Sequence, residues 1–335
     1  MVAMLLIVAL HSFIYSGIYN VPNRLGVNYF THVSLSHVAS VGVDCFWLLT
    51  GYFMATSRAV KWGRLFEYWL MVVFYSVVAY AIDSRIHPDV FSVKGLLQAC
   101  TPILSCRYWF MTVYFGLAIL APYLNQALSG VPPRDRKIGL GILFGLISFL
   151  PSFGTHVFAT PSFSLFWAMA MYALGAVLRM DELEGRNIPG TRLKWGLACG
   201  AWILAVLGCQ GVNMLAKKLT GARFFEMSDN TFFVNALGAF CLFNFFQLAD
   251  FRSRTIQIVT SWCAPCVLGV YLIHEAPGVA HSIWDLFYGD RSCCASPFYL
   301  VYLLFAIVSI FVGSLLLDHV RKFFFDKIFR RSQRP

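Results

Sequence analysis

Charged side chains are scarce in this chain. Only 13% of the 335 residues are Asp, Glu, Lys or Arg, whereas soluble proteins carry about 25%. Apolar residues make up 59% and aromatic residues 17%, and the apolar stretches run for about 18 to 23 residues without the alternation of β-barrel strands. The composition excludes a soluble protein, a membrane β-barrel, a coiled coil and a disordered chain. It predicts an all-α integral membrane protein.

The motifs of soluble enzymes are also missing. The sequence contains no Gly-rich phosphate loop, no G-x-S-x-G elbow and no H-E-x-x-H. No internal repeat, low-complexity tract or soluble domain stands out. The N-terminus lacks the basic n-region and the A-x-A-like cleavage site of a signal peptide, so we expect its apolar run to be a first span that is not removed.

Apolar runs that end at charges or at Pro/Gly clusters predict about ten transmembrane helices in a single membrane domain, 1–335. Both termini are predicted to be cytoplasmic, with a basic cytoplasmic tail at 318–335. The expected spans are 2–19, 33–55, 65–83, 103–125, 138–154, 162–178, 195–214, 228–248, 256–274 and 298–317.

The placement of basic residues sets this orientation. With the N-terminus inside, eighteen of the 26 Lys and Arg residues fall on the inner side and eight on the outer side, which is the positive-inside bias of membrane proteins. The net charge of +10 is therefore explained by insertion and by contact with anionic lipids. We expect the lipid bilayer as a partner and no nucleic acid.

Two ionisable residues lie at membrane depth, where such groups are costly and mark function by default. His11 is near the middle of the first span, and its imidazole can act as a general base, accept an acyl group, ligate a metal or bond to a neighbouring helix. Asp44 shares a helix face with Trp47 and Gly51. Its carboxylate can orient an imidazole, hold an Arg, or form a purely structural bond between helices.

Two further clusters lie near the outer surface. Arg107, just before Trp109, can grip an anionic lipid-linked sugar or simply reach for lipid headgroups. Tyr271 and His274, with Glu275 adjacent, can line an acceptor entrance or cap the end of a helix.

Metal patterns are weak, and we expect no metal site. His32 and His37 are five residues apart, and Cys263 and Cys266 form a single CxxC with no second pair. Four other cysteines lie on or near the outer connections, where three disulfide connectivities are open: Cys100, Cys106, Cys293 and Cys294.

Four motifs, in order along nearly the whole chain, resemble the membrane acyltransferase family 3. They are AMLLIVALH at 3–11, GVDCFWLLTGY at 42–52, YWF at 108–110 with LAPYLN at 120–125, and LGVYLIHE at 268–275. The third and fourth are most similar to the subgroup that modifies surface polysaccharides and carries no extra soluble domain.

The resemblance implies an O-acyltransferase that moves an acyl group, usually acetyl, from cytoplasmic acyl-CoA to a hydroxyl of a surface carbohydrate. The protein would then be a multi-pass protein of the cell membrane, the bacterial cytoplasmic membrane, with acetyl-CoA as donor substrate and no permanently bound cofactor. The family's first-span His falls on His11, which is thereby marked as catalytic. Its aspartate motif falls on Asp44, with Thr50 and Gly51 in place of the common Ser-Gly.

Two departures from the family pattern concern basic residues. The family usually has an Arg one to two turns before Leu5, and the sequence begins too late to contain it, which suggests a late start or a truncation. The basic pair that meets the donor's phosphates is represented by Lys61 and Arg64.

The hypothetical mechanism of acyl transfer centres on His11. His11 takes a proton from the sugar hydroxyl or carries the acyl group as acyl-imidazole, Asp44 stabilises the imidazolium, and the rings of Trp47, Trp109 and Tyr271 support the acceptor sugar. The main alternative is a transporter or flippase for a lipid-linked sugar, which the missing repeat disfavours. A third hypothesis, a structural or sensory membrane protein, does not explain why His11 and Asp44 lie at membrane depth.

Overall fold

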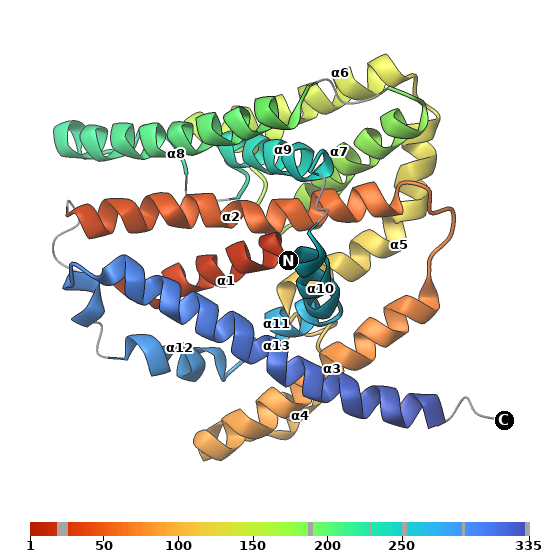
Figure 1. Ribbon diagram of the computed structural model, residues 1–335, viewed down its shortest axis with the longest axis vertical. Helices are drawn as coiled ribbons and strands as arrows, with labels where there is room; N and C mark the ends of the chain where they lie inside the picture. Colours follow the sequence, from red (N-terminus) through yellow and green to blue (C-terminus); the bar gives the residue numbers. More distant parts are fainter. Residues whose placement is uncertain (19–25, 187–189, 228–229, 250–252, 290–291, 332–335) are drawn as a thin grey trace. The chain divides into compact units, whose positions relative to one another are not determined.

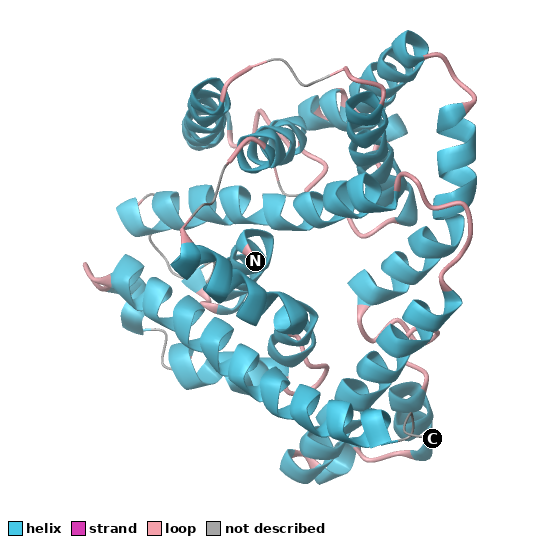
Figure 2. Cartoon of the chain, turned by 45° about the vertical axis from the view of Figure 1, so that its right-hand side comes forward, coloured by secondary structure: helices cyan, strands magenta, loops and turns pink. Residues whose placement is uncertain are grey.

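The computed structural model describes residues 1–18, 26–186, 190–227, 230–249, 253–289 and 292–331, and these form helices with no strand among them (Figures 1 and 2). The all-α prediction is confirmed. The α-helices are α1 (Val2–Tyr15), α2 (Val27–Met54), α3 (Trp62–Ile86), α4 (Val93–Cys100), α5 (Trp109–Ser129), α6 (Pro133–Phe144), α7 (Leu165–Leu183), α8 (Arg192–Thr220), α9 (Phe233–Gln247), α10 (Arg254–Cys263), α11 (Val267–His274), α12 (Ala280–Tyr288) and α13 (Tyr299–Arg331).

Short helical turns join some of these elements. A π-helical turn, η3 (Gly145–Phe149), continues α6, and a 3-10 turn, η6 (Ala264–Cys266), joins α10 to α11. The remaining 3-10 turns are η2 (Pro88–Val90), η4 (Pro151–Phe153), η5 (His156–Phe158) and η7 (Ser292–Ala295).

Seven helical stretches among the described residues are long and apolar enough to cross a membrane, and each overlaps one of the ten expected spans. They are Val27–Met54, Trp62–Ile86, Trp109–Ser129, Pro133–Phe153, Arg192–Thr220, Arg254–His274 and Tyr299–Lys327. The protein is therefore a multi-pass membrane protein.

The other three expected spans also coincide with helices, but these are less suited to cross alone. Helices α1 and α9 have 14 and 15 residues, whereas a span needs about 20. Helix α7 has 19 residues, but its last turns hold Arg179, Asp181 and Glu182. The count of ten and the cytoplasmic placement of the termini stay predictions.

The helices group into two compact units, each built from separated parts of the chain. Unit 1 comprises residues 1–24, 70–108 and 250–335, and in it α1 packs against α11, α12 and α13. Unit 2 comprises 25–69 and 109–249, and in it α2 packs against α7, α8 and α9 (Figure 1). The single domain over 1–335 stays a prediction.

In unit 1, a buried carboxylate fixes α13. Asp318 is fully buried and accepts hydrogen bonds from the Tyr75 hydroxyl at 2.6 Å and from Nε of Arg321 at 2.6 Å. A Cβ on Gly269 would lie 2.1 Å from the Asp318 Cγ, so α11 comes this close only because it has a glycine there. The stretch expected as a tail from 318 thus continues α13 to Arg331, and 332–335 lie outside the described residues.

In unit 2, two glycines allow α2 and α7 to touch backbone to backbone. A Cβ on Gly51 would lie 1.9 Å from the carbonyl oxygen of Tyr172, and one on Gly175 would lie 2.0 Å from that of Leu48. Small residues at helix crossings are typical of membrane proteins, where close packing replaces the hydrophobic effect between helices. This crossing gives Gly51 a structural role.

The end of α2 is tied down by one amide side chain from α5. Asn125 Nδ2 donates to the carbonyl oxygens of Met54 at 2.7 Å and Ser57 at 3.0 Å, and its Oδ1 accepts from the Tyr172 hydroxyl at 2.9 Å. The Met54 carbonyl also accepts a bond from the Ser57 backbone N–H at 2.9 Å, so Asn125 reinforces the turn that follows α2. The LAPYLN motif therefore holds three helices together.

Candidate functional site

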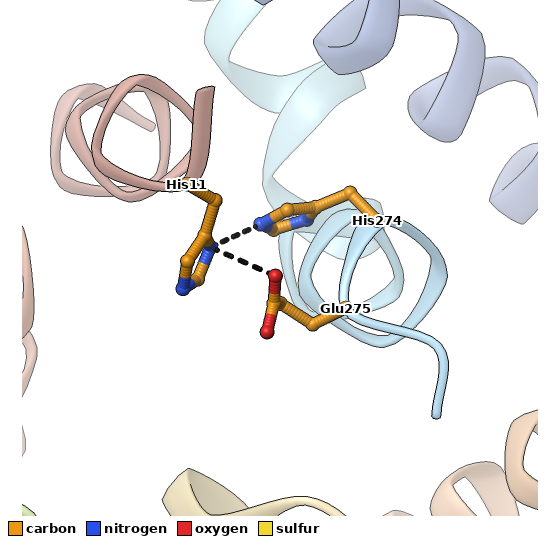
Figure 3. A group of neighbouring side chains, drawn as sticks. All are labelled: His11, His274 and Glu275. Carbon is orange, nitrogen blue, oxygen red and sulfur yellow. Dashed lines mark hydrogen bonds and ion pairs between the residues drawn. The ribbon is translucent and has the colours of Figure 1, made fainter. Parts of the chain in front are cut away.

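Two helices of unit 1 bring three ionisable side chains together (Figure 3). His11 of α1 lies with Nδ1 at 2.8 Å from His274 Nε2, at the end of α11, and at 3.5 Å from the Glu275 carboxylate. His274 is fully buried, while the side chains of His11 and Glu275 are 13% and 21% exposed. The His11–His274 pair joins residues 263 positions apart in the chain.

The hydrogen bonds assign the protons of this pair. His274 Nδ1 lies 2.5 Å from the carbonyl oxygen of Val270, which only accepts, so this nitrogen carries a proton. In a neutral ring His274 Nε2 is then an acceptor, and His11 Nδ1 must be the donor. The lone pair of His11 is therefore on Nε2, the nitrogen that points away from both partners in Figure 3.

Glu275 supplies negative charge next to the donating edge of His11. It follows the last residue of the candidate span Arg254–His274, and its carboxylate also takes part in a hydrogen bond with Tyr15. Burial raises the pKa of Glu275 to about 7, opposed in part by the bond with Tyr15. Its charge therefore changes near neutral pH.

Aromatic rings hold α1 in place beside α12. Tyr15 stacks on Trp284 with ring centroids 5.5 Å apart, and Trp284 stacks on Tyr288 at 6.2 Å. The Tyr288 hydroxyl lies 2.5 Å from the Ser12 hydroxyl, next to His11 in the sequence. These contacts hold the part of α1 that carries His11 against α12.

The same three residues offer ligand atoms within 4.8 Å of one another. Around a tetrahedral zinc ion with Zn–N bonds of about 2.0–2.1 Å, two nitrogens would lie about 3.3 Å apart. The observed 2.8 Å between the two imidazoles is a hydrogen-bond distance. The arrangement therefore suits proton transfer or nucleophilic attack at His11 better than metal ligation.

Arg107 and Tyr271, both expected to bind the acceptor, lie in unit 1 as well. The Arg107 guanidinium is 5.8 Å from the Tyr80 ring centroid, and its Nη2 is 3.5 Å from the carbonyl oxygen of Pro277. Tyr271 is buried against Tyr108, with ring centroids 6.0 Å apart. Both residues thus flank the segment that carries His274.

Asp44, Trp47 and Trp109 lie in unit 2. Asp44 is fully buried and accepts a hydrogen bond from the Trp167 indole at 2.9 Å. Trp47 is fully buried and stacks on Phe110 at 4.3 Å, and the Trp109 ring meets Phe163 edge to face. These contacts give Asp44 and Trp47 partners within the core of unit 2.

Lys61 and Arg64 are exposed at the start of α3. The free N–H groups of a helix start also favour anions, so the position suits the phosphate contact expected of the pair. In the part of the chain that the structure describes, no disulfide joins the cysteines, Cys100, Cys106, Cys293 and Cys294 included.

The sequence identified His11 and His274 separately but gave them different roles, and it treated Glu275 only as a neighbour of His274. The structure joins all three. A signal was present, because His11 and the His274–Glu275 pair stand in two of the motifs described above and carry ionisable groups at or next to membrane depth. The part played by Tyr15, Trp284 and Tyr288 had no such signal, since aromatic residues are common throughout the chain.

Comparison with known protein families identifies the family of this chain. A family model described as an acyltransferase domain matches residues 1–319. No curated protein and no solved structure matches the chain. Because the family model spans nearly the whole sequence, including every residue of the His11 cluster, the chain belongs to the membrane acyltransferase family 3.

Proposed function

We propose that this membrane acyltransferase moves an acyl group, acetyl, from cytoplasmic acyl-CoA to a hydroxyl of a cell-surface or lipid-linked polysaccharide. The catalytic residue in this proposal is His11, and the protein lies in the bacterial cytoplasmic membrane. The observation that supports this role is the bond from His11 Nδ1 to His274 Nε2 at 2.8 Å. This bond leaves Nε2 of His11 with a lone pair that bonds to neither His274 nor Glu275.

Two routes use that lone pair. In the direct route, His11 Nε2 takes the proton of the sugar hydroxyl while the hydroxyl oxygen attacks the thioester carbonyl; CoA leaves as a thiolate and receives the proton. In the covalent route, Nε2 attacks the thioester first, which gives a positively charged acyl-imidazole and a CoA thiolate. The sugar hydroxyl then attacks the acyl carbon, the C–N bond breaks to restore the neutral imidazole, and the hydroxyl proton passes to the thiolate. Both routes produce one ester and one CoA thiol.

The partners of His11 favour each route at the moment when its ring becomes positive. The proton on Nδ1 then forms a charge-assisted bond to His274, which is stronger than the bond of the neutral ring. The Glu275 carboxylate at 3.5 Å adds an attraction that acts only on the charged ring. Interactions that strengthen in the transition state are those that raise kcat.

Other residues are proposed to bind the donor and the acceptor. Lys61 and Arg64 attract the phosphates of the donor, and Arg107, Trp109, Tyr271 and the outer part of the His274 segment meet the acceptor. Asp44 and Trp47 support the second helix from within, because each is fully buried. No permanently bound cofactor takes part.

The experiment is acetyl transfer from labelled acetyl-CoA by purified protein in detergent, with His11→Ala as the variant. We expect a loss of at least about 100-fold, the usual contribution of a general base, at unchanged abundance. His87→Ala is the matched control, because His87 is half exposed and pairs with Asp83. Full transfer by His11→Ala would refute the role. Movement of a lipid-linked sugar without release of CoA would identify a flippase.

A further inference from the structure

Unit 2 contains a cavity that the proposed reaction does not use. It has a volume of about 690 Å³ and lies between α6 with η3, α7 and α9. Most of its lining is apolar, with Phe144, Phe149, Leu174, Phe233 and Phe240 among the larger side chains.

Polar groups are confined to one end of the cavity, apart from one serine. Lys137 near the start of α6 and Asp181 with Arg186 at the end of α7 form that end. At the opposite end, Ser148 is the polar lining residue, and its hydroxyl donates to the carbonyl oxygen of Thr231 at 2.6 Å. Its hydroxyl proton is therefore already used, and the body of the cavity is apolar in effect.

The charged end favours an anion. Asp181 is 8% exposed and bonds to both Lys137 at 2.7 Å and Arg186 at 3.0 Å. Arg186 also pairs with Glu184, which bonds to Arg136 at 3.0 Å, so three cationic side chains meet two carboxylates and the cluster has a net positive charge. The Lys137 and Arg186 side chains are 55% and 38% exposed. The Lys137 ammonium has three N–H donors, and its ion pair with Asp181 does not use all of them, whereas Nε and Nη2 of Arg186 already bond to Asp181. A phosphate oxygen is the acceptor that such paired donors fit.

The length of the cavity matches one leaflet of a bilayer. From Lys137 to Phe149, α6 and η3 rise by about 18 Å at about 1.5 Å per residue. Half of a hydrocarbon core of about 30 Å is about 15 Å. A molecule with its headgroup at the charged end and a hydrocarbon chain of one leaflet's length therefore fits the cavity.

We propose that this cavity binds one glycerophospholipid with an anionic headgroup, with its phosphate at Lys137 and Arg186 and an acyl chain along α6, η3 and α9. The site lies within unit 2 and does not depend on the proposed acyl transfer at His11. Lipid binding and catalysis can therefore fail separately.

Two neighbouring glycines leave space for an added side chain at the cavity wall. A Cβ on Gly141 or Gly145, both of which line the cavity, would meet nothing within 4 Å. The same is true of Gly139, which is not among the lining residues. Gly141→Phe with Gly145→Phe is thus the blocking variant, and Gly139→Phe is its matched control.

The experiment uses full-length protein in detergent with phosphatidylglycerol that carries a photoreactive group at the end of one chain. On wild-type protein we expect saturable labelling of peptides from residues 133–149 and 233–240. The blocking variant should lower affinity by at least about 10-fold, since a chain can no longer be buried. Lys137→Gln should lower it by about fivefold, and Gly139→Phe and Arg134→Gln should leave it unchanged.

Two unlabelled competitors separate the parts of the ligand. Diacylglycerol has the chains without the phosphate, and glycerol phosphate has the phosphate without the chains; neither should displace the probe at equal concentration. Competition by either one would overturn the proposal, as would equal labelling of the blocking and control variants. If the blocking variant does not fold, the peptides labelled in wild-type protein decide the matter, and labelling confined to other helices would refute the site.

Discussion

Removal of the His274 side chain is the sharpest test of how the histidine pair works. In His274→Ala, the Nδ1 proton of His11 loses its acceptor at 2.8 Å and keeps only the Glu275 carboxylate at 3.5 Å. Only the longer contact with Glu275 then favours the proton on Nδ1, so the tautomer of His11 is fixed less firmly. We therefore expect a slower chemical step with little change in the KM for acyl-CoA.

The size of the effect follows from the change in the hydrogen bond during the reaction. A bond to a charged group contributes about 1.5–3 kcal/mol, and a bond between neutral groups about 0.5–1.5 kcal/mol. The difference, about 1–1.5 kcal/mol, acts only when His11 is protonated and corresponds to about a 10-fold loss in kcat. The wrong tautomer of His11 adds to this, so the total is about 10- to 50-fold.

The assay is the steady-state rate of CoA release with a defined glycan acceptor, normalised to folded protein. Normalisation is needed because His274 is fully buried and the carbonyl of Val270 loses its donor, at a cost of about 1–3 kcal/mol in stability. His274→Gln offers a new acceptor to His11 and should recover part of the rate. A folded His274→Ala protein with the kcat of the parent would refute the reasoning.

Three further predictions concern separate parts of the molecule. The pKa of Glu275 is raised to about 7, so the side chain is neutral below that pH and charged above it, and kcat should increase as pH rises through about 7. Glu275→Gln should remove this part of the pH profile of kcat. An unchanged profile would contradict a role of the Glu275 charge in the reaction. Gly51→Ala places a Cβ against a backbone carbonyl of α7 at 1.9 Å and should destabilise the protein by at least about 3 kcal/mol, seen as lost yield and a lower Tm; a normal Tm would show that the two helices can separate. Lys61→Ala with Arg64→Ala should raise the KM for acyl-CoA about 10-fold with kcat nearly constant, since two exposed charges contribute to donor affinity; an unchanged KM would move the donor site elsewhere.

Hydropathy predicted the helical segments well because each is a local property of the chain. The stretches around 33–55 and 256–274, for example, coincide with candidate spans. It predicted their lengths less well where polar residues interrupt the pattern. Helix α2 begins at Val27, in a polar stretch before the apolar run, because packing against α7 and α9 can hold residues in a helix that hydropathy alone does not assign to one.

The chemistry of the site was only half predictable, and the reason is physical. The cost of an imidazole in an apolar segment is visible in the sequence, so His11 could be singled out. The partner that offsets this cost is set by tertiary packing, which hydropathy does not show. Asp44 accepts a hydrogen bond from Trp167, and its role beside His11 stays a prediction. The carboxylate next to His11 is Glu275, which had been assigned to the outer edge of a span.

The separation of 263 residues between the two histidines also has a consequence for biogenesis. A chain that enters the membrane from its N-terminus carries His11 in its first helix, but the ring has no partner until α11 has been made. During most of synthesis the protein therefore holds an imidazole whose protons are not yet ordered. In the proposed mechanism, reactivity toward thioesters would begin only when insertion is nearly finished, and a stalled or truncated chain would not consume the donor.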